Sequence, residues 1–158
     1  MKQIISIFLA FLLMISPAFA LTSADFTRNY AEFGAVFETP ELSETVVNKE
    51  LDGEAAKIIG TSSTVEVGFS LNSSQEIASA FVRRGSEENL GDFFAACVSV
   101  SCALKGDFSD LSNLYVNILH QYFVLRSGTK EDIEVIGDYI LSMSNSESGY
   151  LYIIRKYF

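Results

Sequence analysis

The spacing of apolar positions predicts a long helix in the middle of the chain. Within Glu87–Lys105, apolar side chains recur every three or four residues, and Ser86 with the two glutamates after it suits a helix start. The arc away from this stripe consists mainly of alanine, serine and cysteine. Because little charge follows the first turn, we expect other elements to cover this helix on both sides. Lys105 and Gly106 are typical of a helix C-terminus.

An adjoining segment, Leu114–Leu125, is apolar at nearly every position. A strand buried on both faces has this pattern, and the content of β-branched and aromatic residues favours that interpretation. The alternative is a helix that begins at Asp110 and has as its stripe Leu111, Leu114, Tyr115, Ile118, Leu119 and Tyr122. We predict the strand.

Two further helices are predicted upstream. The segment Leu21–Thr39 fits a short helix or an aromatic arm, because aromatic residues recur at spacings of four, three and four: Phe26, Tyr30, Phe33 and Phe37. Thr39-Pro40-Glu41 then matches the start of a helix that would end at Gly60. Asp52-Gly53 offers an alternative, a hairpin turn between strands at 45–51 and 54–59. We expect the helix.

The remaining segments are divided between strands and helices. Thr64–Leu71 alternates apolar and polar positions, which predicts a half-solvated strand. Gln75–Arg84 is expected to be a helix, as is the segment after Thr129, whose stripe would be Ile133, Ile136, Ile140 and Leu141. Gly149–Phe158 predicts a closing strand, and its Arg155 and Lys156 suit the edge of a sheet.

This order of elements predicts an α+β fold. We expect a two-layer sandwich in which a small mixed or antiparallel sheet of about three to four strands carries helices on one face. If residues 114–125 are helical instead, the alternative is a mainly α-helical bundle.

Residues 1–20 have the features of a cleaved secretory signal peptide. Lys2 gives a positive start, Ile4–Ile15 is apolar apart from Ser6, and Pro17 precedes the small-residue cleavage pattern Ala18-Phe19-Ala20. We expect cleavage after Ala20, one globular domain over residues 21–158, and a secreted, extracellular or periplasmic location. The alternative is a retained membrane anchor; no later stretch is long and apolar enough to span a bilayer.

The charge of the chain excludes some partners. The sequence has 20 acidic and 11 basic side chains and a net charge of −9, which becomes −10 when residues 1–20 are removed. Phosphate contacts require clustered cations, so we expect neither nucleic acid nor an anionic lipid surface as a partner. Acidity of this kind favours solubility.

The two cysteines are not spaced for a local disulfide. Cys97 and Cys102 lie five positions apart, and their side chains would point in different directions on either a helix or a strand. We expect two buried thiols, with an intermolecular bridge through Cys102 as the alternative. Asn72-Ser73-Ser74 matches the acceptor pattern for N-glycosylation.

Sequence motifs for catalysis are missing. There is one histidine, no C-x-x-C pair, no G-x-S-x-G motif and no glycine-rich nucleotide loop. His120 could form a nucleophile pair with Cys97 or Cys102, and paired carboxylates are a separate alternative. The acidic groups do not follow a calcium-loop pattern; they are Asp107 with Asp110, and Glu131, Asp132, Glu134 and Asp138. We therefore assign no catalytic, cofactor-binding or metal-binding residue and expect no cofactor.

Three hypotheses for function follow. The first is an exported, non-catalytic interaction domain that binds a protein or an envelope component. The second is a small secreted hydrolase that uses His120 or paired carboxylates. The third is a self-associating structural subunit, a homo-oligomer that uses the terminal strand or the small-residue side of the central helix. The aromatic residues nearest the terminus are expected to be available for a ligand: Tyr150, Tyr152 and Tyr157.

Overall fold

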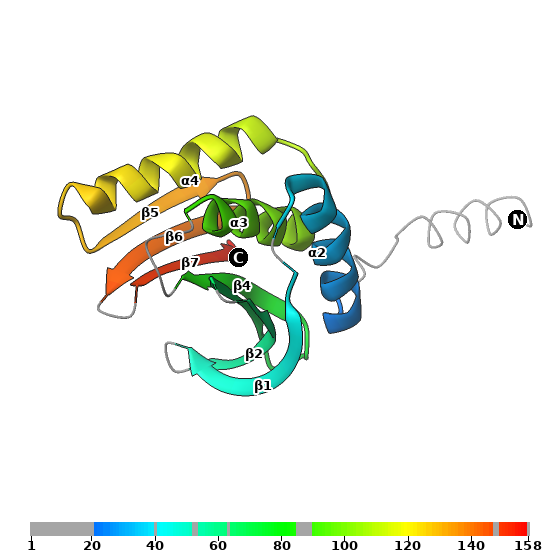
Figure 1. Cartoon of the computed structure of the whole chain (residues 1–158). Coiled ribbons are helices and arrows are strands. Elements are labelled where there is room, and N and C mark those ends of the chain that lie inside the picture. The colour runs from blue at the N-terminus through cyan, green and yellow to red at the C-terminus, as the bar shows by residue number, and fades with distance from the viewer. Residues whose placement is uncertain are drawn as a thin grey trace, which may run out of the picture.

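The computed structural model describes residues 21–39, 41–51, 54–62, 64–84, 90–146 and 149–157. The predicted signal peptide and the predicted helix start at Ser86 lie outside these residues. The described part is α+β, as expected, with three helices and one sheet (Figure 1). The elements are α2 (Ser23–Phe37), β1 (Ser43–Leu51), β2 (Glu54–Thr61), β3 (Val65–Leu71), β4 (Ile77–Arg84), α3 (Leu90–Lys105), α4 (Leu111–Arg126), β5 (Glu131–Ile136), β6 (Tyr139–Ser146) and β7 (Gly149–Lys156).

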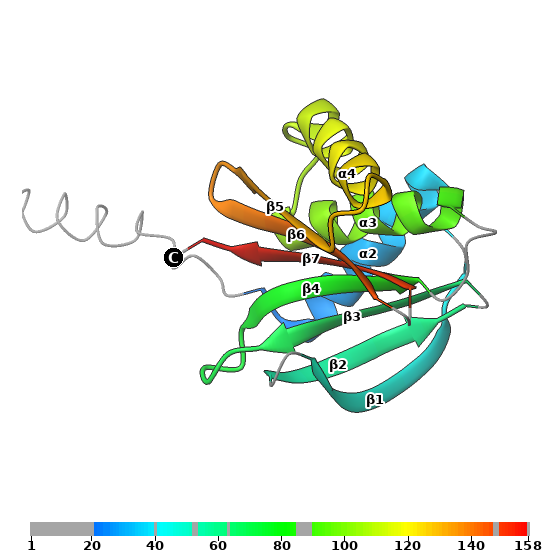
Figure 2. The same cartoon turned by 90° about the vertical axis from the view of Figure 1, so that its left-hand side faces the viewer.

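The sheet is antiparallel throughout, with the strand order β1-β2-β3-β4-β7-β6-β5. It has seven strands, so the expectation of three to four was wrong. The closing strand β7 does not lie at an edge, because it pairs with β4 on one side and β6 on the other. The sheet is strongly curved, and the three helices gather on one side of it (Figures 1 and 2). The two-layer description stays a prediction.

Strands β1 and β2 pair antiparallel, from Ser43↔Thr61 to Leu51↔Glu54, so the helix predicted over this segment was wrong. Two paired strands are the alternative that the sequence offered. The turn predicted at Asp52-Gly53 lies outside the described residues.

The helix predicted at Gln75–Arg84 is strand β4. Its residues are buried on both faces: Ala80 and Val82 face one core cluster and Phe81 belongs to another. A strand covered on both sides needs no polar alternation, so its sequence resembles that of a buried helix. Gly68 of β3 makes room for the Phe81 ring, since a Cβ there would overlap both this ring and the carbonyl oxygen of Lys57.

The helix predicted after Thr129 is the β5–β6 hairpin. Ile136 pairs with Tyr139 across a two-residue turn at Gly137-Asp138, where Gly137 has a positive φ of 55°. Glycine tolerates this backbone region at no steric cost. The apolar positions on both sides of the turn happen to match a helical stripe, which explains the error.

The strand predicted at Leu114–Leu125 is helix α4, which was the alternative. Leu114, Ile118 and Leu125 form its buried stripe. The segment looked like a strand because apolar residues also occupy its exposed face, namely Tyr115, Val116 and Phe123. The mainly helical bundle that would have followed from this helix is excluded by the seven-stranded sheet.

Helix α3 is the centre of the core, and other elements cover it on several sides, as its pattern predicted. It packs against α2, α4, β3, β4 and β7. Its small residues permit this close approach: Ala96, Cys97, Ser101 and Ala103 are fully buried. The Ser101 hydroxyl lies 2.8 Å from the Tyr152 hydroxyl, which joins α3 to β7. Cys97 and Cys102 are buried free thiols, as expected.

Helix α2 and strand β3 were also predicted correctly. Phe26, Tyr30 and Phe33 are buried, and the Phe26 ring meets the Phe69 ring of β3 edge-on at 5.5 Å. The outward-facing positions of β3 are less solvated than the alternation suggested, because Gly68 and Ser70 are buried. A second, smaller apolar cluster covers that face, built from Ala56, Ile58, Phe81, Leu151 and Ile153.

Candidate functional site

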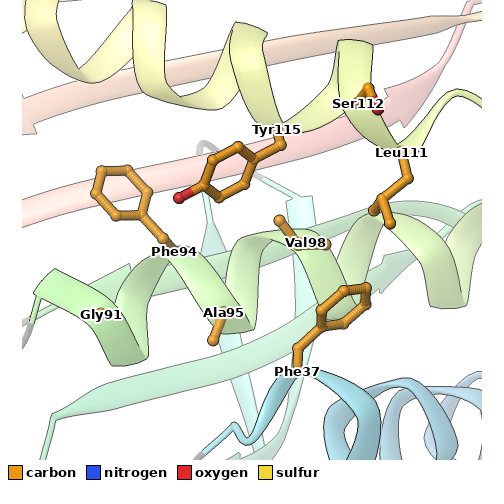
Figure 3. Close-up of a pocket in the computed structure, with 8 residues that line it drawn as sticks. All are labelled: Phe37, Gly91, Phe94, Ala95, Val98, Leu111, Ser112 and Tyr115. Carbon is orange, nitrogen blue, oxygen red and sulfur yellow. The ribbon is translucent and has the colours of Figure 1, made fainter.

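An apolar pocket of about 450 Å³ lies where α2, α3 and α4 meet (Figure 3). Its volume is within the range of sites that hold small molecules. All three helices contribute to the wall, whose residues are Phe37, Gly91, Phe94, Ala95, Val98, Leu111, Ser112 and Tyr115.

The pocket exists because α3 carries glycine and alanine on the face that borders it. Gly91, Ala95 and Val98 follow one another at helical spacing and therefore share a face. A Cβ at Gly91 would meet nothing within 4 Å, so this end of the hollow is open. The larger side chains opposite, Leu111 and Tyr115 of α4, then cannot close the gap.

None of the described residues that line this pocket is charged. Among them, the side-chain hydrogen-bonding groups are the hydroxyls of Ser112 and Tyr115. The Tyr115 ring is 47 % exposed and lies toward Phe94 at the mouth of the pocket (Figure 3). The Phe94 ring packs edge-on against the Tyr122 ring, with the two ring centres 5.3 Å apart. Such a site suits a neutral, largely apolar group, because a charged group would find no partner there.

A second hollow, of about 560 Å³, lies between α2 and the segment that precedes β1. Its wall includes Tyr30, Gly34, Leu42 and Ile59. Two carboxylates, Glu38 and Glu41, also line it, so its chemistry differs from that of the neutral pocket.

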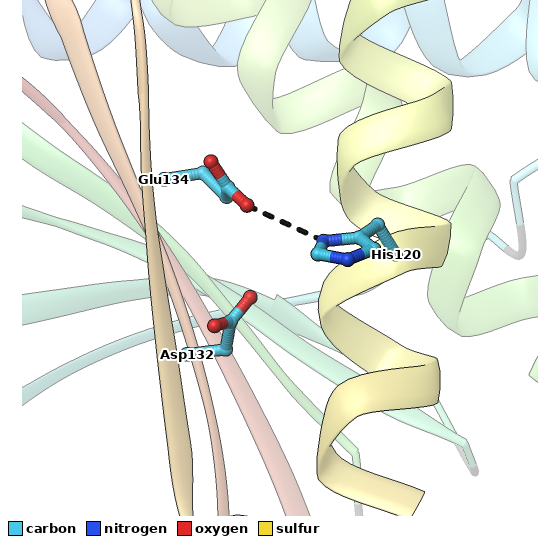
Figure 4. Close-up of side chains that lie close together, drawn as sticks. All are labelled: His120, Asp132 and Glu134. Atoms are coloured by element: carbon cyan, nitrogen blue, oxygen red, sulfur yellow. Dashed lines mark ion pairs between the residues drawn. The ribbon is translucent and has the colours of Figure 1, made fainter.

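His120 lies on α4 beside two acidic residues of β5 (Figure 4). Its Nδ1 is 3.3 Å from Oε1 of Glu134, and one ligand atom from each of His120, Asp132 and Glu134 falls within 4.8 Å of the others. Gln121 fixes this arrangement by donating to the backbone carbonyls of Asp132 and Leu141 at 3.1 and 3.0 Å. The structure thus brings His120 to part of the acidic cluster that the sequence showed.

This trio is the one group of three potential metal ligands within the described part of the chain. One carboxylate oxygen of Asp132 is buried and makes no hydrogen bond, whereas the His120 side chain is 58 % exposed. Exposed acidic groups of this kind are often simply solvated. The three ligand atoms are close enough to hold a cation, but their arrangement does not by itself indicate a metal site.

The cysteines are not placed for catalysis. Burial raises the pKa of Cys97 well above its usual value and raises the pKa of Cys102 to about 11. A thiol in such surroundings is inert, because the thiolate is the nucleophile. No hydrogen bond or ion pair in the described structure joins either thiol to His120, so the pairing expected for a cysteine nucleophile is not formed.

Arg84 is a residue that sequence reasoning missed. It ends β4, its side chain is 1 % exposed, and none of its three guanidinium nitrogens has a hydrogen-bond partner in the described structure. The guanidinium carbon lies 5.8 Å from the centre of the Tyr150 ring, a cation–π distance. Tyr150 and Tyr152, which were expected to be available for a ligand, are buried, and only Tyr157 is exposed.

Comparison of the chain with family models, with curated proteins and with solved structures finds no match. Among the described residues, no helix has the length and apolar character needed to cross a membrane.

Proposed function

We propose that this chain is an exported, non-catalytic binding domain that holds a small, neutral, apolar molecule in the pocket between α2, α3 and α4. The observation that carries the proposal is the run of small side chains at Gly91 and Ala95, which leaves about 450 Å³ beside Leu111 and Tyr115. Apolar walls with a few hydroxyls are typical of small-molecule sites.

The uncharged residues that line the pocket favour a neutral ligand. The Ser112 and Tyr115 hydroxyls can satisfy one polar end of the ligand, and none of the described lining residues carries a charge that could neutralise an ionised ligand. The acidity of the chain, with a net charge of −9, also disfavours anionic ligands in general.

Export is supported by the sequence of residues 1–20. Intact-mass analysis of the protein recovered from its native source tests this part of the proposal. A mass that begins at Leu21 is expected, and a mass that retains residues 1–20 would contradict cleavage.

The binding proposal is tested with N-phenyl-1-naphthylamine, a neutral apolar dye whose fluorescence rises in apolar surroundings. We expect saturable binding that Ala95→Leu abolishes, because the larger side chain fills the pocket. Ala35→Leu is the matched control, since it places the same side chain in the second hollow. Loss of binding in Ala35→Leu with full binding in Ala95→Leu would overturn the assignment, as would failure of the dye to bind at all.

The hydrolase hypothesis has one supporting observation, the 3.3 Å contact between His120 and Glu134. The exposure of His120 weighs against it, because an acid–base pair open to water lacks the shielding that catalytic sites use. We therefore place it second. Self-association stays a prediction, and sedimentation equilibrium would test it.

A further inference from the structure

Strand β5 is an edge of the sheet and leaves half of its backbone groups without a neighbouring strand. It pairs only with β6, through a continuous register from Glu131↔Ser144 to Ile136↔Tyr139. In the described structure no strand lies on its other side (Figure 2). A row of open N–H and C=O groups of this kind is a template for one more strand.

The two faces of β5 differ in chemistry. Asp132 and Glu134 point toward α4, since their cross-strand partners Met143 and Leu141 are buried in the core. Ile133 and Val135 point the other way and are 54 % and 61 % exposed. An added strand would therefore meet carboxylates on one face and apolar side chains on the other.

Charge decides which strand can be added. Glu131–Ile136 contains three acidic residues and no basic one. If two copies of this chain paired antiparallel through β5 with their α4 faces on the same side, carboxylates would lie opposite carboxylates, which is destabilising. Charges that point inward from an edge strand generally discourage pairing. A strand with basic residues at these positions escapes that repulsion and gains ion pairs instead.

We propose that the open edge of β5 binds an extended segment of another protein in which basic and apolar residues alternate. The basic side chains would pair with Asp132 and Glu134 on the face toward α4, where one Asp132 oxygen has no hydrogen-bond partner among the residues that the structure describes. The apolar side chains would cover Ile133 and Val135. The backbone groups supply affinity, and the alternation supplies specificity. This surface is separate from the proposed ligand pocket, and the inference does not depend on it.

The test uses the purified protein and a fluorescent ten-residue peptide that alternates lysine and valine. We expect saturable binding, measured by fluorescence anisotropy, that weakens as salt is added. The isosteric double variant Asp132→Asn with Glu134→Gln should weaken binding about tenfold. This is the expected loss when two ion pairs are removed, each near the upper end of the free energies measured for solvent-exposed pairs. The control variant Glu32→Gln with Asp110→Asn also removes two exposed acidic groups. It should change the affinity for the peptide by less than about twofold.

The location is tested separately. Amide hydrogen exchange with the lysine–valine peptide bound should slow in β5, and Val135→Thr should weaken binding while keeping a β-branched side chain. The proposal is overturned if a glutamate–valine peptide binds equally well, if protection falls outside β5, or if no binding occurs at low salt. A dimer in sedimentation equilibrium that Val135→Thr dissociates would assign this edge to self-association and would equally contradict the proposal.

Discussion

The guanidinium of Arg84 lies in the core with no hydrogen-bond partner among the described residues. A buried charge without a partner costs free energy, and replacing it with an apolar side chain of similar volume is often stabilising. We expect Arg84→Met to raise the free energy of unfolding by about 1–4 kcal/mol, measured by urea denaturation. Loss of stability would show that the native protein supplies a partner to this group.

Arg83 provides the matched control for that change. It is next in sequence, but its side chain is a third exposed and lies 3.3 Å from Glu66. Ion pairs open to solvent contribute little, so Arg83→Met should alter the free energy of unfolding by less than about 1 kcal/mol.

Buried phenols and thiols predict a loss of stability at alkaline pH. Burial raises the pKa of Tyr30 to about 12 and the pKa of Cys102 to about 11, and it raises the pKa values of Tyr152 and Cys97 well above the usual ones. The unfolded chain therefore releases these protons first, beginning near the ordinary cysteine pKa of about 8.5. Stability is fully present below that pH and falls as the pH rises toward the folded-state values.

The measurement is the urea midpoint at pH 7.5, 9 and 10.5. We expect a progressive decrease, and Tyr152→Phe should make the decrease shallower because it removes one of the four groups. A midpoint that does not change over this range would show that these groups titrate alike in the folded and unfolded chain.

Among the elements, the cross-strand pair of Gly68 on β3 and Phe81 on β4 is especially sensitive to added volume. A Cβ at Gly68 would overlap the Phe81 ring and the carbonyl oxygen of Lys57, and the backbone atom cannot move aside freely. Gly68→Ala should therefore lower the free energy of unfolding by about 1–3 kcal/mol, as overpacked core substitutions do, measured by urea denaturation.

Gly91→Ala is the control for that prediction. The added methyl group meets nothing within 4 Å, and alanine is the better helix former, so we expect a gain of about 0.5–1 kcal/mol. If both glycine substitutions changed the free energy of unfolding by the same amount, a Cβ at Gly68 would not be in close contact with the Phe81 ring and the Lys57 carbonyl oxygen.

The sequence predicted α2 and β7, which are buried mainly on one side, and α3, which is rich in small residues. It also predicted β3, whose apolar and polar residues alternate although both of its faces are buried. The prediction was wrong where apolar residues are not confined to one buried face of their element. In α4, exposed Val116 and Phe123 hide the buried stripe, and in β4 the burial of both faces removes the alternation. The turn at Gly137-Asp138 was concealed by apolar residues that fit a helical repeat.

The candidate pocket was only partly predictable for the same reason. The small residues of α3 were visible in the sequence, but we took them to be covered completely. Whether Ala95 faces a neighbour or a hollow depends on how α4 crosses α3, and α4 had been predicted as a strand. His120 was recognised as a candidate, and its acidic neighbours were recognised as a cluster, but their proximity depends on the β5–β6 hairpin.

In the whole molecule, the three described helices lie on one side of the antiparallel sheet (Figure 1). The pocket is lined by residues of all three helices. The sheet therefore forms no part of the proposed ligand site. On its other face, the half-buried apolar side chains of Leu151 and Ile153 offer a second apolar surface to a hydrophobic dye. A measurement that locates the bound molecule must distinguish these two regions.

Nuclear Overhauser effects between bound N-phenyl-1-naphthylamine and the methyl groups of the protein make that distinction directly. If the dye binds in the pocket, we expect contacts to Ala95, Val98 and Leu111, which line it. Contacts confined to Leu151 and Ile153, or the absence of any contact to the three pocket residues, would contradict it.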